Sequence, residues 1–293
     1  MTRMRTIVGI GVAAAMYAVT PAVAQTATGL PTSQPNLLLI YREEVKVGHN
    51  ADHERTEIGW PAAYEKAKSP YYYLALVSLT GAPEAWFVSP FESYEQMDKA
   101  MAIDREDPML AVEIPRLQRA DGEHLTSIRS YHAVARKELS HGQYPDITKQ
   151  RYFTINTFRM RPGREGDFAA AAKAYGAALS RGGSSATFRV YQIAAGMAGP
   201  TYVVFGSTPT LGTLDKMMAS EDAVAKAFSP DDQKIFEKFS EGLVSSDSQR
   251  FAVNPAMSYV SAEVRASDPA FWMPKKKPAP KKITTIEPKS GSR

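Results

Sequence analysis

Two histidines and a glutamate, His49, His53 and Glu57, follow Gly48 at four-residue intervals. On an α-helix this spacing places the three side chains on one face, with His53 and Glu57 one turn apart. An imidazole beside a carboxylate is suited to two kinds of chemistry. The histidine can act as a general base that the carboxylate orients, or the side chains can coordinate a metal ion.

Three interpretations of this face are open from the sequence. In the first, His53 and Glu57 form an exposed polar pair, because such i,i+4 pairs are common on helix surfaces. In the second, His53 is the polar contact of a ligand pocket with aromatic walls between the helix and a sheet. In the third, one of the two histidines binds a metal ion or haem iron. The candidate residues are His53 and Glu57 for catalysis, Trp60, Tyr64 and Tyr72 for ligand binding, and His49 and His53 for a metal.

The stretch that contains these histidines has a counterpart 115 residues later, where Gly163 takes the place of Gly48. Each stretch follows a strand-like run and begins a helix-like run. In the later helix the corresponding face is apolar, because Phe168, Ala172, Tyr175 and Leu179 replace His53, Glu57, Trp60 and Tyr64. A core-facing stripe has therefore gained an imidazole and a carboxylate, which must reach water, each other or a ligand to avoid the cost of burial.

Apolar and alternating runs predict the same order of elements, β-α-β-β-α-β, in both halves. In the first half we expect strands over 36–45, 71–79, 85–89 and 127–136, and helices over 49–68 and from 91 to about 120. In the second half we expect strands over 151–160, 187–194 and 202–205, helices over 163–179 and around 214–218, and a last strand between 251 and 263. Each half is thus predicted to be a ferredoxin-like unit, with both helices on one face of an antiparallel sheet. The two uncovered sheet faces can bury each other.

The glycine turn into a charged helix, the hairpin, and the Asp98-Lys99 and Asp215-Lys216 helices together resemble the dimeric α+β barrel superfamily. The resemblance is strongest to its antibiotic-biosynthesis-monooxygenase-like and NIPSNAP-like branches, and it covers residues 36–136 and 151–263. It implies an α+β fold in which two tandem ferredoxin-like units pair as an intramolecular α+β barrel, an internal pseudo-dimer. Some members of the superfamily bind haem through a helix-borne histidine, so the resemblance also allows a haem at His53.

The N-terminus has the three parts of a secretory signal peptide. Arg3 and Arg5 precede an apolar run over 7–19, and Ala22-Val23-Ala24 fits a cleavage site. We therefore predict an exported protein that is periplasmic or extracellular after cleavage. The chain contains no cysteine, which excludes disulfides and thiolate metal sites.

The basic character of the chain resides in its C-terminal tail. Of the 35 Lys and Arg residues, two lie within 1–24 and seven within 274–293. Of the 31 Asp and Glu residues, none lies within 1–24 and one lies within 274–293. The remainder carries a net charge of −4, so nucleic-acid binding is not expected. The Lys/Pro-rich tail cannot form a core and is predicted to be disordered. It either solubilises the protein or attracts it to an anionic envelope surface through Lys275, Lys276, Lys277, Lys281 and Lys282.

The predicted organisation has six parts: a signal peptide (1–24), a linker (25–35), a first unit (36–140), a connector (141–150), a second unit (151–265) and the tail (266–293). No P-loop or dinucleotide-binding glycine motif is present. The expected function is the binding of a small apolar or aromatic molecule in the cleft of the first unit, with catalysis and cofactor left open. One alternative is a cofactor-light monooxygenase-like or haem-binding enzyme that uses His53. The other is an envelope interaction protein that acts through its cationic tail.

Overall fold

The protein is described by a computed structural model over residues 29–273. Eight antiparallel strands form a closed barrel in the order β1-β3-β2-β8-β5-β7-β6-β4. The strands are β1 (Leu37–Val45), β2 (Leu74–Ser78), β3 (Glu84–Phe91), β4 (Leu125–Ala135), β5 (Tyr152–Met160), β6 (Phe188–Ala195), β7 (Thr201–Thr208) and β8 (Leu243–Val253). Each half of the chain supplies four neighbouring strands, and the β2–β8 and β4–β6 pairs join the halves.

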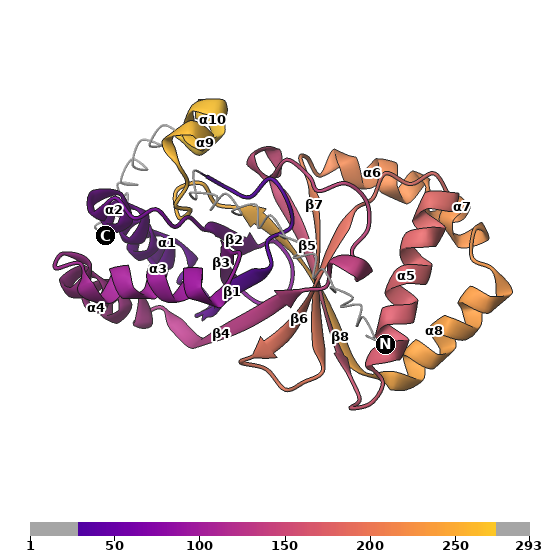
Figure 1. The fold of residues 1–293 in the computed structure, drawn as a ribbon. Coiled ribbons are helices and arrows are strands. Elements are labelled where there is room, and N and C mark those ends of the chain that lie inside the picture. Colours follow the sequence, from indigo (N-terminus) through magenta and orange to yellow (C-terminus); the bar gives the residue numbers. More distant parts are fainter. Residues whose placement is uncertain (1–28, 274–293) are drawn as a thin grey trace, which may run out of the picture.

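Helices cover the outside of the barrel in two groups, one on each side (Figure 1). The first group is α1 (Asn50–Glu57), α2 (Gly59–Ala67), α3 (Tyr94–Glu106) and α4 (Leu110–Gly122). The second group is α5 (Glu165–Arg181), α6 (Gly212–Ala219), α7 (Glu221–Lys226) and α8 (Pro230–Gly242). Two short helices, α9 (Ala262–Ser267) and α10 (Pro269–Trp272), follow the last strand. Between residues 29 and 273, no helix combines the length and hydrophobicity that crossing a bilayer requires.

The alternation of side chains along each strand divides the core into layers. On β1, Leu38 and Ile40 belong to the large cluster that fills the barrel, whereas Leu37 and Leu39 pack against Met97 of α3. The closed α+β barrel predicted from the sequence is therefore confirmed. The finer prediction of duplicated ferredoxin-like units stays a prediction.

The turn between β1 and α1 is built on Gly48, which has φ of +87°, and Gly163 adopts φ of +84° at the turn between β5 and α5. Such left-handed conformations favour glycine because a Cβ atom would strain them. The predicted helix 49–68 is in fact two helices, α1 and α2, that meet at Ile58. Pro61 has no N–H group to continue the hydrogen bonds of α1, and Gly59 lets the junction approach Leu117 so closely that an added Cβ would overlap it.

Two other predicted boundaries are wrong, and the predicted linker is partly buried. The last strand spans Leu243–Val253, not 251–263; most of its residues are exposed, so it lacks the apolar alternation of a half-buried strand. Residues 266–273 belong to α9, α10 and the turn after them, and Trp272 is only 4% exposed, so a disordered tail cannot start at 266. In the predicted linker, Leu30 and Gln34 are buried against the barrel. The predicted signal peptide and the lysines of the tail lie outside the described residues.

Candidate functional site

A group of four buried side chains, Glu43, His53, Glu57 and Asp121, lies between the barrel and the first group of helices; we call it the buried quartet. Glu43 comes from β1, His53 and Glu57 from α1, and Asp121 from the last turn of α4. On β1, Glu43 continues the face of Leu37 and Leu39, which points away from the barrel interior. His53 and Glu57 are each 3% exposed, so the interpretation of an exposed surface pair is wrong.

The imidazole of His53 lies at the centre of the quartet. Its Nε2 atom is 2.9 Å from Oε2 of Glu43 and 3.5 Å from Oδ1 of Asp121. Thr56 donates a hydrogen bond of 3.1 Å to the same Asp121 oxygen. One ligand atom from each of the four residues lies within 4.8 Å of the others.

The surroundings of the three carboxyl groups in the quartet disfavour their charged forms. Burial raises the pKa of Glu43, Glu57 and Asp121 above their ordinary values, because the charged form loses its hydration. For Glu57 the negative charges of Glu43 and Asp121 raise the pKa further. The Oε1 atom of Glu57 is also buried without a hydrogen-bond partner among residues 29–273. Three acidic groups therefore share a site that offers them few donors.

A second polar group lies nearer the surface, one helical turn before His53. His49, Asp52 and His124 are partly exposed, and the Nδ1 atoms of His49 and His124 are 3.1 Å apart. The sequence named His49 and His53 as candidate ligands of a metal ion, with either one as the ligand. The structure places them in two adjacent groups.

The aromatic residues predicted to bind a ligand pack on one another. Tyr64 stacks on Trp60 and on Tyr259, with ring centroids 6.4 and 5.7 Å apart, and Tyr72 lies 5.0 Å from Tyr259. Tyr259 belongs to the segment after β8 and donates a hydrogen bond to the carbonyl of Ser69. The aromatic walls predicted for a pocket between helix and sheet thus contact each other.

A cavity of about 80 Å³ is found instead inside the barrel. Its wall is mostly apolar, with Leu38, Leu74 and Phe205 from strands of both halves. Leu30 of the N-terminal segment and Ile147 of the connector also line it. The cavity is therefore formed by strands of both halves and by the segments that cover one end of the barrel, not by the cleft of the first unit.

One charged side chain, Arg189 of β6, lines this cavity. It is 7% exposed, and no carboxylate in the described part of the chain forms an ion pair with it. Its terminal nitrogens donate to backbone carbonyls of the connector, including 2.6 Å to His141 and 3.0 Å to Gly142. Its Nε–H group is buried and has no acceptor within residues 29–273. Burial lowers the pKa of Arg189, but a guanidinium stays charged at neutral pH.

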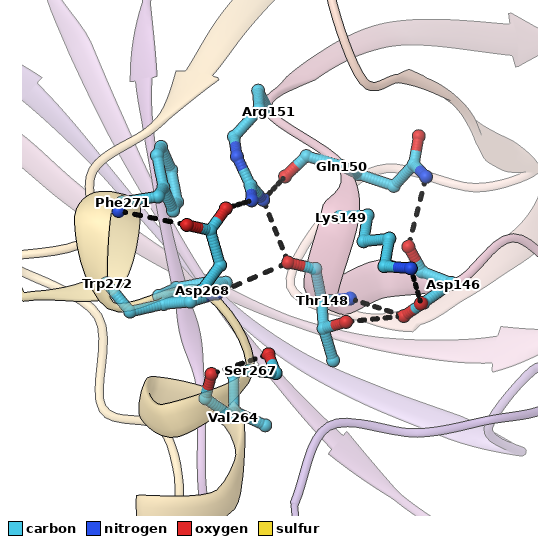
Figure 2. Close-up of polar contacts among 10 residues, drawn as sticks. All are labelled: Asp146, Thr148, Lys149, Gln150, Arg151, Val264, Ser267, Asp268, Phe271 and Trp272. Atoms are coloured by element: carbon cyan, nitrogen blue, oxygen red, sulfur yellow. Dashed lines mark hydrogen bonds and ion pairs between the residues drawn. The ribbon is translucent and has the colours of Figure 1, made fainter.

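Figure 2 shows polar contacts among residues 146–151 and the C-terminal helices α9 and α10, next to the end of the barrel that holds the cavity. Arg151 forms an ion pair of 2.6 Å with Asp268, and its guanidinium lies 3.7 Å from the ring centroid of Phe271. Trp272 donates from Nε1 to the carbonyl oxygen of Thr148 at 3.2 Å. The C-terminal helices are thereby attached to the connector.

Three residues important to these sites were missed from the sequence: Glu43, Asp121 and Arg189. Glu43 had a signal, since it shares the strand face of two leucines that must point into a core. Asp121 lies at the end of α4. Its contact with His53 of α1 could not be predicted from the spacing of residues along the sequence. Arg189 sits in an apolar strand, where a lone charge facing the barrel is itself unusual.

Haem does not fit at His53. The Nε2 atom, through which a histidine would reach iron, already contacts two carboxylates, and the side chain is 4% exposed. An iron porphyrin needs an open face beside its ligand, and the helices and strand of the quartet enclose this one. The haem interpretation of His53 is therefore abandoned.

No protein family matches the chain. No curated protein matches it in sequence. Among solved structures, an anthrone oxidase-like protein shares the fold with a TM-score of 0.50 and 13% identity, over 80% of this chain and 99% of that one. A candidate monooxygenase from Lactobacillus acidophilus NCFM has a TM-score of 0.47 and 8% identity over 75% and 94% of the two chains. Chlorite dismutase from Candidatus Nitrospira defluvii, in complex with imidazole, has a TM-score of 0.45 and 10% identity over 80% and 96%.

The anthrone oxidase-like protein supports the barrel fold alone, because only 13% of the aligned residues are identical. Beyond the fold, the resemblance to the dimeric α+β barrel superfamily stays a prediction. At such identities the likeness carries no activity. The NIPSNAP-like affinity stays a prediction.

Proposed function

We propose that this protein binds a small, mainly apolar molecule with one anionic group inside its barrel. The observation that carries the proposal is Arg189, a buried guanidinium in the cavity wall that lacks a carboxylate partner in the described part of the chain. A buried charge is costly unless it is paired. The carbonyls of the connector satisfy its terminal nitrogens, and the free Nε–H leaves one donor for a ligand.

The rest of the cavity sets the chemical class of the ligand. Leucine, isoleucine, phenylalanine and proline side chains dominate its wall, and Tyr144 and Tyr191 add two aromatic rings. An apolar cavity of about 150 Å³ accepts benzene, so a cavity of about 80 Å³ suits a short aliphatic chain unless the wall moves. A short-chain carboxylate meets both requirements.

Binding is favoured over catalysis by the same wall. Among the residues that line the cavity there is no histidine, aspartate or glutamate. Burial also raises the pKa of Tyr144 and Tyr191, so neither is a base near neutral pH. His53 and Glu57 do not line the cavity, and their catalytic role, like the monooxygenase-like alternative, stays a prediction.

The remaining proposals come from the sequence. We propose that the chain is exported, that its halves are duplicated ferredoxin-like units, and that its basic tail attracts anionic envelope surfaces. The order of strands in the barrel supports the second of these, since each half supplies four contiguous strands.

The test is calorimetric titration of the full chain with butyrate and pentanoate, with 1-butanol and 1-pentanol as uncharged controls. We expect the carboxylates to bind at least tenfold more tightly than the alcohols, a difference of about 1.4 kcal/mol or more. Arg189→Met should remove this preference, whereas Arg189→Lys should retain part of it. Arg136→Met, which removes an arginine that does not line the cavity, should behave as the wild type. Equal affinity for acids and alcohols would contradict the proposal.

A further inference from the structure

The buried quartet gathers the donor atoms of a metal site. Glu43, His53, Glu57 and Asp121 come from three different elements, yet one ligand atom from each lies within 4.8 Å of the others. Each residue is between 3% and 6% exposed. The four side chains from β1, α1 and α4 thus meet between the barrel and the first group of helices.

The quartet has an excess of negative charge when its three carboxyl groups are ionised. In the described residues, its only ion pairs join His53 to Glu43 and His53 to Asp121, and neither lysine nor arginine pairs with any of the three carboxylates. A protonated His53 could offset only one of three negative charges. Buried charges of one sign are unfavourable unless something neutralises them.

Glu57 provides an independent sign that something is missing. Its Oε1 atom is buried, belongs to a side chain that is 3% exposed, and receives no hydrogen bond from any residue between 29 and 273. A buried acceptor without a partner is unfavourable in a folded protein. A cation within the quartet would both coordinate this oxygen and offset the negative charge of the carboxylates.

We propose that Glu43, His53, Glu57 and Asp121 bind one divalent transition-metal ion of the Mn²⁺ or Zn²⁺ class. The donor set of three carboxylates and one imidazole selects this class, because carboxylates suit Mn²⁺ and imidazole suits Zn²⁺. With a neutral imidazole, a dication leaves a net charge of −1 in the site. Calcium is disfavoured, because it prefers oxygen ligands alone.

The spacing of the donors agrees with a shared ion. The Nε2 atom of His53 lies 2.9 Å from Oε2 of Glu43 and 3.5 Å from Oδ1 of Asp121. Two ligands at roughly 2.1 Å from one ion are separated by about 3 to 3.5 Å. The largest separation, up to 4.8 Å, requires only a small inward movement of a carboxylate.

The competing explanation is a metal-free network in which the carboxyl groups hold protons and act only in the structure. Both explanations fit the burial of the quartet, but they differ in what added metal does. The proposal is independent of ligand binding in the barrel, because none of the four residues lines the cavity. Failure of one proposal therefore leaves the other standing.

The experiment titrates the full chain, freed of metal with EDTA and dialysed, with Zn²⁺ and with Mn²⁺. Native mass spectrometry gives the stoichiometry, calorimetry the affinity, and thermal unfolding the change in Tm. We expect one ion per chain and a rise in Tm of several degrees. Glu57→Gln and Asp121→Asn keep the side-chain shapes and should each weaken binding at least tenfold, while circular dichroism in EDTA shows that they fold.

The neighbouring surface group supplies the matched control. The double variant His49→Asn and His124→Asn removes two donors outside the quartet, and its affinity should equal that of the wild type. The proposal is overturned if the wild type binds no ion, if the two carboxyl variants bind as the wild type does, or if only the surface double variant loses the ion. Should Glu57→Gln fail to fold, Asp121→Asn decides between the outcomes.

Discussion

The buried quartet and its counterpart in the second half occupy the same place in the fold but differ entirely in chemistry. Glu43 of β1 lies opposite Ile128 of β4, and Phe158 of β5 lies opposite Ser246 of β8. By the same strand register and helix spacing, the positions of Glu43, His53, Glu57 and Asp121 are taken in the second half by Phe158, Phe168, Ala172 and Phe239. These three phenylalanines contact one another, with ring centroids 5.8 to 6.3 Å apart.

The difference shows that this position between barrel and helices does not need polar residues to hold its shape. The aromatic cluster stabilises the second half by apolar burial, which is favourable without partners. The quartet buries charge at the same location, where a hydrophobic replacement is often neutral or stabilising. A purely structural account therefore explains the second half and leaves the first half needing a reason beyond stability.

The largest expected effect comes from placing the first half's imidazole in the second half. In Phe168→His, the ring loses its stacking on Tyr202, at a centroid distance of 3.8 Å, and a polar group is buried among aromatic side chains. We expect the free energy of unfolding to fall by about 3 to 5 kcal/mol, as for other large losses from a core. Urea unfolding followed by circular dichroism measures it. Phe168→Leu is the control and should lose clearly less, because it keeps the site apolar.

A loss below about 1 kcal/mol in Phe168→His would mean that the second half tolerates polar groups as readily as the first. The contrast between the two clusters would then lose its energetic meaning.

A smaller effect is expected from the reverse exchange, His53→Phe, measured in EDTA. The change removes the only side chain that forms an ion pair with Glu43 or Asp121 among the described residues, so we expect a loss of about 2 to 3 kcal/mol. Replacing the whole quartet by its counterparts, with Glu43→Phe, His53→Phe, Glu57→Ala and Asp121→Phe together, should restore most of this stability. The same unfolding measurement gives both values.

Such non-additivity identifies four side chains that act as one unit. If the fourfold variant loses at least as much free energy of unfolding as its four single variants lose together, the four side chains do not act as one unit, and the comparison with the aromatic cluster fails.

Much of the fold was accessible from the sequence because its signals are local. The glycine turns at Gly48 and Gly163 and the apolar strand faces predict the order of elements and the barrel. The strand Leu243–Val253 was misplaced because most of its residues face solvent, which removes the periodic pattern on which strand prediction depends. The ordered C-terminal helices were missed because Trp272 gains its partners from the distant connector.

Half of the quartet could be predicted, and the other half could not, for the same physical reason. His53 and Glu57 are one helical turn apart, so spacing alone brings them together. Glu43 and Asp121 reach them only through the packing of β1 and α4, which no single helix or strand encodes. Arg189 was missed in the same way, since the cavity that it lines requires strands of both halves and two covering segments.

The smallest expected effect concerns Asp104 of α3. This acid lies in the helix layer of the first half, outside the quartet, and is only partly buried. Burial raises the pKa of Asp104 to about 6, although a hydrogen bond from Tyr64 and the charge of Arg105 lower it; Tyr41 of β1 also faces it. The pKa of Asp104 is higher in the folded protein than in the unfolded chain, so protonation of its carboxyl group stabilises the folded state. Its contribution is full below about pH 4 and is lost as the pH rises through 6.

Asp104→Asn should therefore raise the free energy of unfolding by about 1 kcal/mol at pH 7.5, a value reduced for the partial exposure of the group, and should change it little at pH 4. Urea unfolding at several pH values between 4 and 7.5 measures this difference, with the exposed Asp98→Asn on the same helix as the control. A gain from Asp104→Asn that is equal at both pH values would show that the amide acts through packing or hydrogen bonding and not through removal of a buried charge.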